Sequence, residues 1–170
     1  MTTMQQRWMN GIGGAPAWVG QAFIAAALLL IAAASFLWLV GRDDGTSSLD
    51  PDELAYSGFM AAELDTLSLQ LTETGYLLQQ PDMDNAAWRS DVARGAEDVR
   101  ASALHVEQEE GVGRFTESDK AVDEAMETYV AAMGTVDKAL ATSDEALIRQ
   151  AFEQMLVAGD ILARANIRGE

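Results

Sequence analysis

Hydrophobic residues follow two different patterns along this chain, and the change falls between residues 40 and 50. From Trp18 to Val40 the sequence runs for 23 residues without a charged side chain. A helix of that length extends about 35 Å, which is enough to cross the hydrocarbon core of a bilayer. After residue 50 the apolar residues instead recur at steps of three and four, the spacing of one helix face. The two patterns predict one transmembrane helix over 18–40 followed by amphipathic helices.

The apolar segment resembles a retained membrane anchor more than a cleaved secretory leader. A leader has an apolar region of about 7 to 15 residues, preceded by several positive charges and closed by a small-x-small site. Here the apolar run continues through residues 36–40, and the preceding segment carries one base, Arg7. Trp18 and Trp38 stand near the two ends, where indole rings favour the membrane interface. We therefore expect a single-pass anchor in the lipid bilayer.

The charges that flank the span give the expected orientation. Residues 1–17 carry Arg7 and no acid, whereas the segment after the span carries Arg42 and then several acids. One base on each side discriminates weakly under the positive-inside rule, but the short flank that is only basic favours the cytoplasm. We expect a cytoplasmic tail over 1–17, a location in the inner membrane, and a periplasmic or extracellular domain after a polar, glycine-containing linker over 41–49.

Small residues are frequent in the predicted span. In lipid, helices associate through close backbone approach, which small side chains permit. The sequence therefore favours packing of the span against other integral membrane subunits. The residues expected to form that packing surface are Gly20, Ala25, Ala32 and Ser35.

A well-marked first helix is predicted at the start of the domain that follows, residues 50–170. Asp50 is expected to cap it, with Pro51 at its first position and Glu53 completing a capping box. The helix is expected to end before Pro81. Its expected inward stripe consists of Leu54, Gly58, Ala61, Leu64, Leu67, Leu71, Gly75 and Leu78.

Three more helices are predicted from the same spacing. Their expected starts are Asp84, then Thr116 with Asp119, then Thr142 with Glu145, and the second helix is expected to close at the GVG of 111–113. Their expected stripes are Trp88, Val92, Gly95, Val99, Ala103 and Val106; Val122, Met126, Tyr129, Met133, Val136 and Leu140; and Leu147, Ala151, Met155, Ala158, Leu162 and Ala165. No stretch alternates like a strand. The sequence predicts an all-α fold, an antiparallel up-down-up-down four-helix bundle outside the membrane.

Charge is concentrated in the predicted bundle. Residues 43–170 hold all 27 acids and 9 of the 11 bases. This excess of negative charge would repel nucleic acid and anionic lipid headgroups, so nucleic-acid binding is not expected. The same charge could form a solvated surface, as in a saline habitat, or a field that attracts a basic soluble protein. The chain has no cysteine, which excludes disulfides, thiolate metal sites and iron–sulfur clusters.

Few side chains offer catalytic or ligating chemistry. His105 is the only histidine, and with Glu109 one turn away it supplies two ligands, too few for a tight metal site. A single histidine also excludes a di-iron bundle and leaves no serine–histidine–acid arrangement. The GIGG of 11–14 lacks the lysine of a phosphate loop. We expect no catalytic residue, no metal and no cofactor, and the acids lie mostly on faces expected to be solvated.

Methionine and tryptophan residues fall on or near the expected inner stripes. A thioether could ligate haem or copper, but no histidine or cysteine accompanies these residues on a core face. Methionine fills gaps in a core far more often than it binds a metal. We expect core packing for Met60, Met126, Met133 and Met155, and a place at one bundle end for Trp88.

These features leave two classes of function. The first is a non-catalytic accessory or structural subunit of a larger inner-membrane complex, for example a respiratory or photosynthetic one. In that case the span would dock against core subunits, and the acidic bundle would brace them or offer a docking surface. The second is a sensor, because a four-helix bundle outside the membrane resembles the ligand-binding regions of chemoreceptors and sensor kinases. A sensor of this kind would signal through a partner, since no second span or cytoplasmic signalling domain is evident.

Overall fold

The structure, a computed structural model, describes residues 50–167, which form four long helices and one short 3₁₀ helix. No strand occurs within this range, so the all-α class predicted from the sequence is confirmed for it. The elements are α3 (Pro51–Gln79), α4 (Ala86–Glu107), η1 (Gly113–Phe115), α5 (Thr116–Thr142) and α6 (Glu145–Ile167).

The membrane part of the prediction lies outside the described residues. It comprises the tail over 1–17, the span over 18–40 and the linker over 41–49. Among the four helices of residues 50–167, none is both long enough and apolar enough to cross a bilayer. The expected packing and interface residues, which are Gly20, Ala25, Ala32, Ser35, Trp18 and Trp38, also lie outside the described range.

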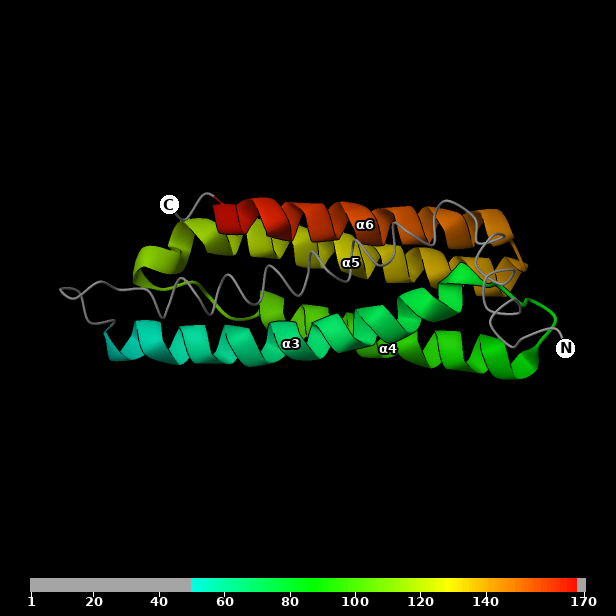
Figure 1. Cartoon of the computed structure of the whole chain (residues 1–170), viewed down its shortest axis with the longest axis horizontal. Helices are drawn as coiled ribbons and strands as arrows, with labels where there is room; N and C mark the ends of the chain where they lie inside the picture. The colour runs from blue at the N-terminus through cyan, green and yellow to red at the C-terminus, as the bar shows by residue number, and fades with distance from the viewer. Residues whose placement is uncertain (1–49, 168–170) are drawn as a thin grey trace, which may run out of the picture.

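The four helices lie side by side and alternate in direction, as in a four-helix bundle (Figure 1). Each helix packs mainly against the helix that follows it in the chain. The α5–α6 interface is the most extensive, whereas α3 and α6 meet over only a few residues. The bundle is therefore closed tightly on three sides and weakly between its first and last helices.

The start of α3 has the capping box that the sequence predicts. The Asp50 carboxylate accepts hydrogen bonds from the backbone N–H groups of Asp52 and Glu53, both at 2.9 Å. The Glu53 carboxylate in turn accepts from the backbone N–H of Asp50 at 3.3 Å. Pro51 occupies the first turn, where its missing N–H is not needed. The helix ends at Gln79, two residues before Pro81.

The start and end of α4 differ from the prediction. Asn85, and not Asp84, caps the helix, because its Oδ1 accepts from the backbone N–H groups of Ala87 at 3.0 Å and Trp88 at 3.2 Å. The helix ends at Glu107, before the expected stop at 111–113. The tandem Asp-Asn sequence offers two capping side chains, and the observed cap is one residue further along.

The expected capping box at the start of α5 is wrong. Phe115 occupies the N-cap position, and no side chain caps the helix there. The Thr116 hydroxyl instead donates to the carbonyl of Gly113 at 3.0 Å, and Asp119 bonds to residues outside the helix. Since η1 leads directly into α5, the preceding turn takes the place that a capping side chain would fill.

The start of α6 is also shifted. Thr142 is the last residue of α5, and the left-handed Ser143, with φ of 53°, ends that helix. The Asp144 carboxylate caps α6 by accepting from the backbone N–H of Ala146 at 2.8 Å. Glu145 is the first helical residue, so the observed cap lies two residues after the predicted one, Thr142.

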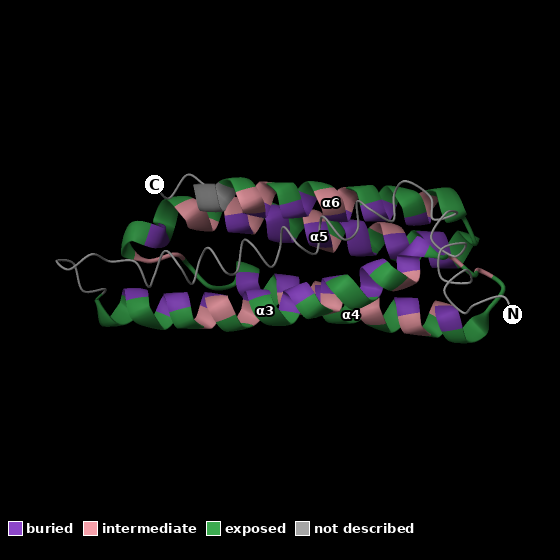
Figure 2. Ribbon diagram, viewed as in Figure 1, coloured by how far each residue is buried: buried purple, intermediate pink, exposed green. Residues whose placement is uncertain are grey.

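The buried residues face the interior of the bundle (Figure 2). Every residue of the stripe predicted for α5 is buried, and so are the four methionines Met60, Met126, Met133 and Met155. In α4 all but Gly95 are buried, and Trp88 donates from Nε1 to the carbonyl of Leu77 at 3.0 Å. In α6 Leu147 is half-buried and Ile148 is buried instead, while the Ala165 side chain lies outside the described set.

The stripe predicted for α3 is right in its second half and wrong in its first. Leu64, Leu67, Leu71, Gly75 and Leu78 are buried as expected. Leu54 is 58% exposed and Gly58 is also exposed, while Tyr56 and Met60 are buried in their place. The predicted stripe therefore begins on the outer side of α3 and reaches the buried side by Leu64, because this helix carries apolar residues on both sides.

The helices α3 and α4 approach each other closely at Gly95. A Cβ atom at this position would lie 2.6 Å from Oγ1 of Thr74, which is shorter than any ordinary contact. Thr74 is buried, and its side chain fills the space that a glycine leaves on α4. Glycine at residue 95 therefore sets the distance between the first two helices.

Candidate functional site

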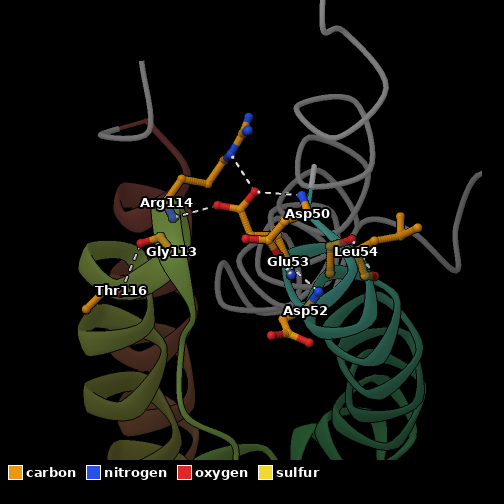
Figure 3. Close-up of polar contacts among 8 residues, drawn as sticks. Asp50, Asp52, Glu53, Leu54, Gly113, Arg114 and Thr116 are labelled. Carbon is orange, nitrogen blue, oxygen red and sulfur yellow. Dashed lines mark hydrogen bonds and ion pairs between the residues drawn. The ribbon is translucent and has the colours of Figure 1, made fainter. Parts of the chain in front are cut away.

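A cluster of polar groups joins the start of α3 to η1 at one end of the bundle (Figure 3). Glu53 is 8% exposed, and its Oε1 accepts from the backbone N–H of Arg114 at 3.0 Å. The Arg114 Nε lies 3.4 Å from Oε2 of the same carboxylate. The backbone N–H of Arg114 lowers the pKa of Glu53, although burial opposes the shift. The carboxylate therefore ties the first helix to the α4–α5 connection.

Gly113 is required at this junction for two reasons. Its φ of 54° lies in the left-handed region that favours glycine, and a Cβ atom there would overlap the Glu53 carboxylate. Both carboxylate oxygens of Glu53 are engaged, by groups of Asp50 and Arg114. This end of the cluster is built for the fold.

A second link crosses the same end of the bundle through Tyr56. Its hydroxyl donates to Oδ1 of Asp119, and Oδ2 of Asp119 accepts from the backbone N–H of Gly111 at 2.7 Å. The Tyr56 ring lies 5.4 Å from the Phe115 ring, measured between centroids. Burial, and then Asp119, raise the pKa of Tyr56. Asp119 is thus a link between α3 and the α4–α5 connection.

Asp123 lies one helical turn beyond Asp119, in surroundings that disfavour its ionised form. Burial raises its pKa, and the carboxylates of Asp119, Glu107 and Glu127 raise it further. Its Oδ1 is buried and has no hydrogen-bond partner among the described residues. Within residues 50–167 no three histidine or acidic side chains are placed to hold a metal ion. The cluster joins α3 to the α4–α5 connection, and the acidic side chains next to it repel one another.

His105 lies at the surface, and the acid beside it is Glu63 of α3. Its Nε2 is 3.9 Å from Oε1 of Glu63 on α3, and its ring packs edge-on against Phe59 with centroids 5.3 Å apart. The side chain is 54% exposed. His105 therefore bridges α4 to α3 at the surface of the bundle.

Tyr129 places a hydroxyl group in the core of the bundle. The residue is 1% exposed, its Oη has no hydrogen-bond partner among the described residues, and burial raises its pKa. A Cβ atom at Gly159 of α6 would lie 3.5 Å from this oxygen. The hydroxyl is enclosed by the α5–α6 interface.

The outer side of α3 is the most unusual surface of the described chain. Five large apolar side chains are exposed among the described residues, and three of them lie on α3: Leu54 at 58%, Leu69 at 62% and Tyr76 at 70%. Most surface residues of a bundle helix are polar or charged. Exposed apolar patches on proteins can serve as binding sites for other molecules.

A seven-residue repeat organises this outer side. Ala55, Ala62, Leu69 and Tyr76 recur every seven residues, and the positions between them continue the steps of three and four. That spacing is the one by which a helix presents a seam to a second helix. The outer stripe, as defined here, consists of Ala55, Gly58, Ala62, Asp65, Leu69, Thr72 and Tyr76, all of them exposed.

A hollow lies beside one end of the outer stripe. It is a shallow depression, wide open to solvent, of about 460 Å³ between α3 and α4. Its lining residues are Thr72, Glu73, Tyr76, Leu77, Asp91 and Arg94. The Arg94 guanidinium is paired with Asp91 at 2.7 Å. The hollow extends the apolar surface around Tyr76 into a recess that can receive a side chain.

Charge on α3 has one sign. The helix carries Asp52, Glu53, Glu63, Asp65 and Glu73 and no lysine or arginine. Asp65 stands in the middle of the outer stripe and is exposed. The sequence prediction missed this surface because it placed a single apolar stripe on each helix.

Comparison of the chain with protein-family models, with curated proteins and with solved structures finds no match. The features of the chain that bear on its function are therefore the fold and the outer stripe of α3.

Proposed function

We propose that this chain is a non-catalytic accessory subunit, anchored in the inner membrane by residues 18–40, whose bundle binds another subunit of a larger membrane complex. The observation that carries the proposal is the outer stripe of α3, an apolar helix surface that the bundle leaves exposed. The amino terminus would be cytoplasmic and the bundle periplasmic or extracellular. The complex would be one that holds integral membrane subunits, of which respiratory and photosynthetic assemblies are examples.

The polar groups of the bundle support a binding role over a catalytic one. Glu53 and Asp119 accept hydrogen bonds from the backbone of the α4–α5 connection, and the Tyr56 hydroxyl donates to Asp119. The lowered pKa of Glu53 and the raised pKa of Tyr56 follow from this packing. Perturbed groups of this kind occur in structural networks as well as in active sites.

The test is co-purification from native membranes in mild detergent. The wild-type chain should come with another subunit in fixed stoichiometry. The double variant Leu69→Ser with Tyr76→Ser should lose that subunit, because both side chains lie on the exposed outer stripe. Val157→Ser is the matched control, since Val157 is also 53% exposed but lies on α6. A wild-type chain that migrates alone would remove the proposal.

The predicted span provides a second contact in the same proposal. Replacing Ala25 and Ala32 with leucine should weaken co-purification, because larger side chains prevent close approach of helices in lipid. Unchanged recovery of the partner would leave the outer stripe as the sole contact and would remove the role assigned to these alanines.

A ligand-binding sensor is the second candidate, and the hollow between α3 and α4 is the observation that favours it. Its lining combines a tyrosine ring with the charged groups of Asp91 and Arg94. A small molecule bound there should raise the melting temperature of the chain, and Arg94→Ala should remove that rise. If the double variant Leu69→Ser with Tyr76→Ser loses the co-purified subunit and no small molecule raises the melting temperature, the accessory role is favoured over the sensor.

A further inference from the structure

We propose that the element docking on α3 is an amphipathic helix of the partner subunit, with an apolar seam and a lysine or arginine at its centre that pairs with Asp65. This inference rests on the proposed function and names the chemistry of its partner. The outer stripe runs from Ala55 to Tyr76, which is about 33 Å of helix at 1.5 Å per residue. A single helix of ordinary length can cover it.

The size of the side chains along the outer stripe sets the shape of the partner. Ala55, Gly58 and Ala62 make the first half shallow, whereas Leu69 and Tyr76 make the second half prominent. A facing helix therefore needs large apolar residues opposite the first half and small residues opposite the second. The hollow beside Tyr76 can take one protruding side chain of that helix.

Asp65 argues against a second copy of this chain as the occupant. It is the fourth of the seven positions of the outer stripe, three positions from Ala55 at one end and three from Tyr76 at the other. Two copies of α3 packed in register, parallel or antiparallel, would therefore bring Asp65 against Asp65. Two carboxylates withdrawn from water at one seam repel each other and lack a counter-charge. The remaining charges of α3 are also all negative, so no group on a second α3 could compensate.

A partner of opposite charge removes this conflict. A carboxylate covered by another helix is stabilised only when a cation or hydrogen-bond donors pair with it. Arginine provides a fork of N–H donors and lysine an ammonium, and either would fix the register of the two helices around Asp65. Glu73 beside the outer stripe would favour a second basic residue about two turns away.

The experiment uses the full chain in its native membranes with a photoreactive phenylalanine analogue at residue 69. Irradiation should join the chain to another protein, and the attachment point should lie in a helical segment with seven-residue apolar spacing and a central lysine or arginine. Asp65→Lys should reduce the cross-linked product about tenfold or more, because it replaces attraction by repulsion at a covered site. Asp65→Glu should keep most of it. The analogue at residue 157 on α6 is the control and should give no such product.

The outcomes separate this inference from the function on which it rests. A product of twice the mass of this chain would overturn the inference in favour of self-association. A product that maps to a segment without a central base, or that is unaffected by Asp65→Lys, would overturn the inference and leave the accessory role intact. No product from residue 69, together with a chain that purifies alone, would overturn both. Restoration of the Asp65→Lys product by an acidic residue at the mapped partner base would support the inference directly.

Discussion

The helices α3 and α5 belong to the same bundle but use their sequences differently. The stripe of α5 is buried throughout, and its outward positions are mostly small or polar. In α3, polar residues such as Ser57, Ser68 and Thr74 are buried, while Leu69 and Tyr76 are exposed. Helix α5 packs extensively on both α4 and α6, whereas α3 packs extensively only on α4. The bundle accounts for the sequence of α5, and it leaves the outer side of α3 to be explained by something outside the bundle.

The largest effect is expected when buried and exposed leucines of α3 are shortened separately, which tests whether the bundle needs both sides of this helix. Leu67 is fully buried, and Leu67→Ala should lower the free energy of unfolding by about 2–5 kcal/mol. Leu69, two residues further, is 62% exposed, and Leu69→Ala should change it by less than about 0.5 kcal/mol. Urea denaturation of the detergent-solubilised chain, followed by circular dichroism, measures both. A large loss with Leu69→Ala would mean that the bundle itself needs the outer stripe.

Glycine substitutions compare a crowded site, where α4 meets α3, with an open site on α5. Gly95→Ala should destabilise the fold by about 1–3 kcal/mol, since the new Cβ meets Thr74 at 2.6 Å. Gly134 on α5 has nothing within 4 Å of the new Cβ, so Gly134→Ala should stabilise by about 0.5–1 kcal/mol through helix propensity. The denaturation midpoints of the two variants should move in opposite directions. Equal shifts would contradict the close α3–α4 approach.

Tyr129 tests how fully α5 is satisfied inside the bundle. Its hydroxyl is buried without a hydrogen-bond partner among the described residues, so Tyr129→Phe should stabilise the fold by about 1 kcal/mol. A rise in the melting temperature is the expected result. A fall would show that the hydroxyl has a partner in the folded protein and that the core of α5 depends on it.

The smallest expected effect concerns the like charges on α5. Asp119, Asp123 and Glu127 follow one another at steps of four, and Asp123→Asn should stabilise by about 0.5–1 kcal/mol at pH 7 by removing two repulsive pairs. Because folding raises the pKa of Asp123, its ionised form destabilises the fold, and protonation relieves this as pH falls. The gain should therefore shrink with falling pH and vanish below about 3.8, where the carboxyl is protonated in both states.

Chemical denaturation of wild type and Asp123→Asn across this pH range measures the effect. Glu124→Gln is the matched control, because Glu124 is an exposed neighbour on the same helix. A gain that is equal for both variants, or that persists unchanged at low pH, would contradict the electrostatic explanation.

The same contrast explains how far the sequence predicts the fold. One apolar stripe on α5 leaves a single way to orient that helix, and all of its predicted core residues are buried. Apolar residues on both sides of α3 leave two ways to orient that helix. The prediction that starts from Leu54 chose the wrong side for the first two turns. The Asp50 box was predictable because its partners lie within three residues. The bond between Tyr56 and Asp119 joins residues 63 apart in sequence, and no local pattern indicates it.

The candidate site was harder to predict than the fold. The sequence predicts one protein contact in the membrane span, at Gly20, Ala25, Ala32 and Ser35, which lie outside the described range. It predicts a second at the acidic bundle but names no residues for it. The outer stripe of α3 shares its seven-residue spacing with the inward stripes, so spacing alone cannot assign it to the surface. Only the packing of α3 on α4 shows which apolar row the bundle leaves exposed.

The most direct measurement is the reactivity of single cysteines in intact native membranes, since the chain itself has no cysteine. A polyethylene-glycol maleimide would report each modified chain as a shift on a gel. If α3 docks on another subunit, Leu69→Cys should react slowly in these intact membranes and rapidly after detergent separates the subunits. Val157→Cys should react rapidly in both conditions. Equal, rapid modification of both cysteines in intact membranes would contradict the assignment of the outer stripe as a docking surface.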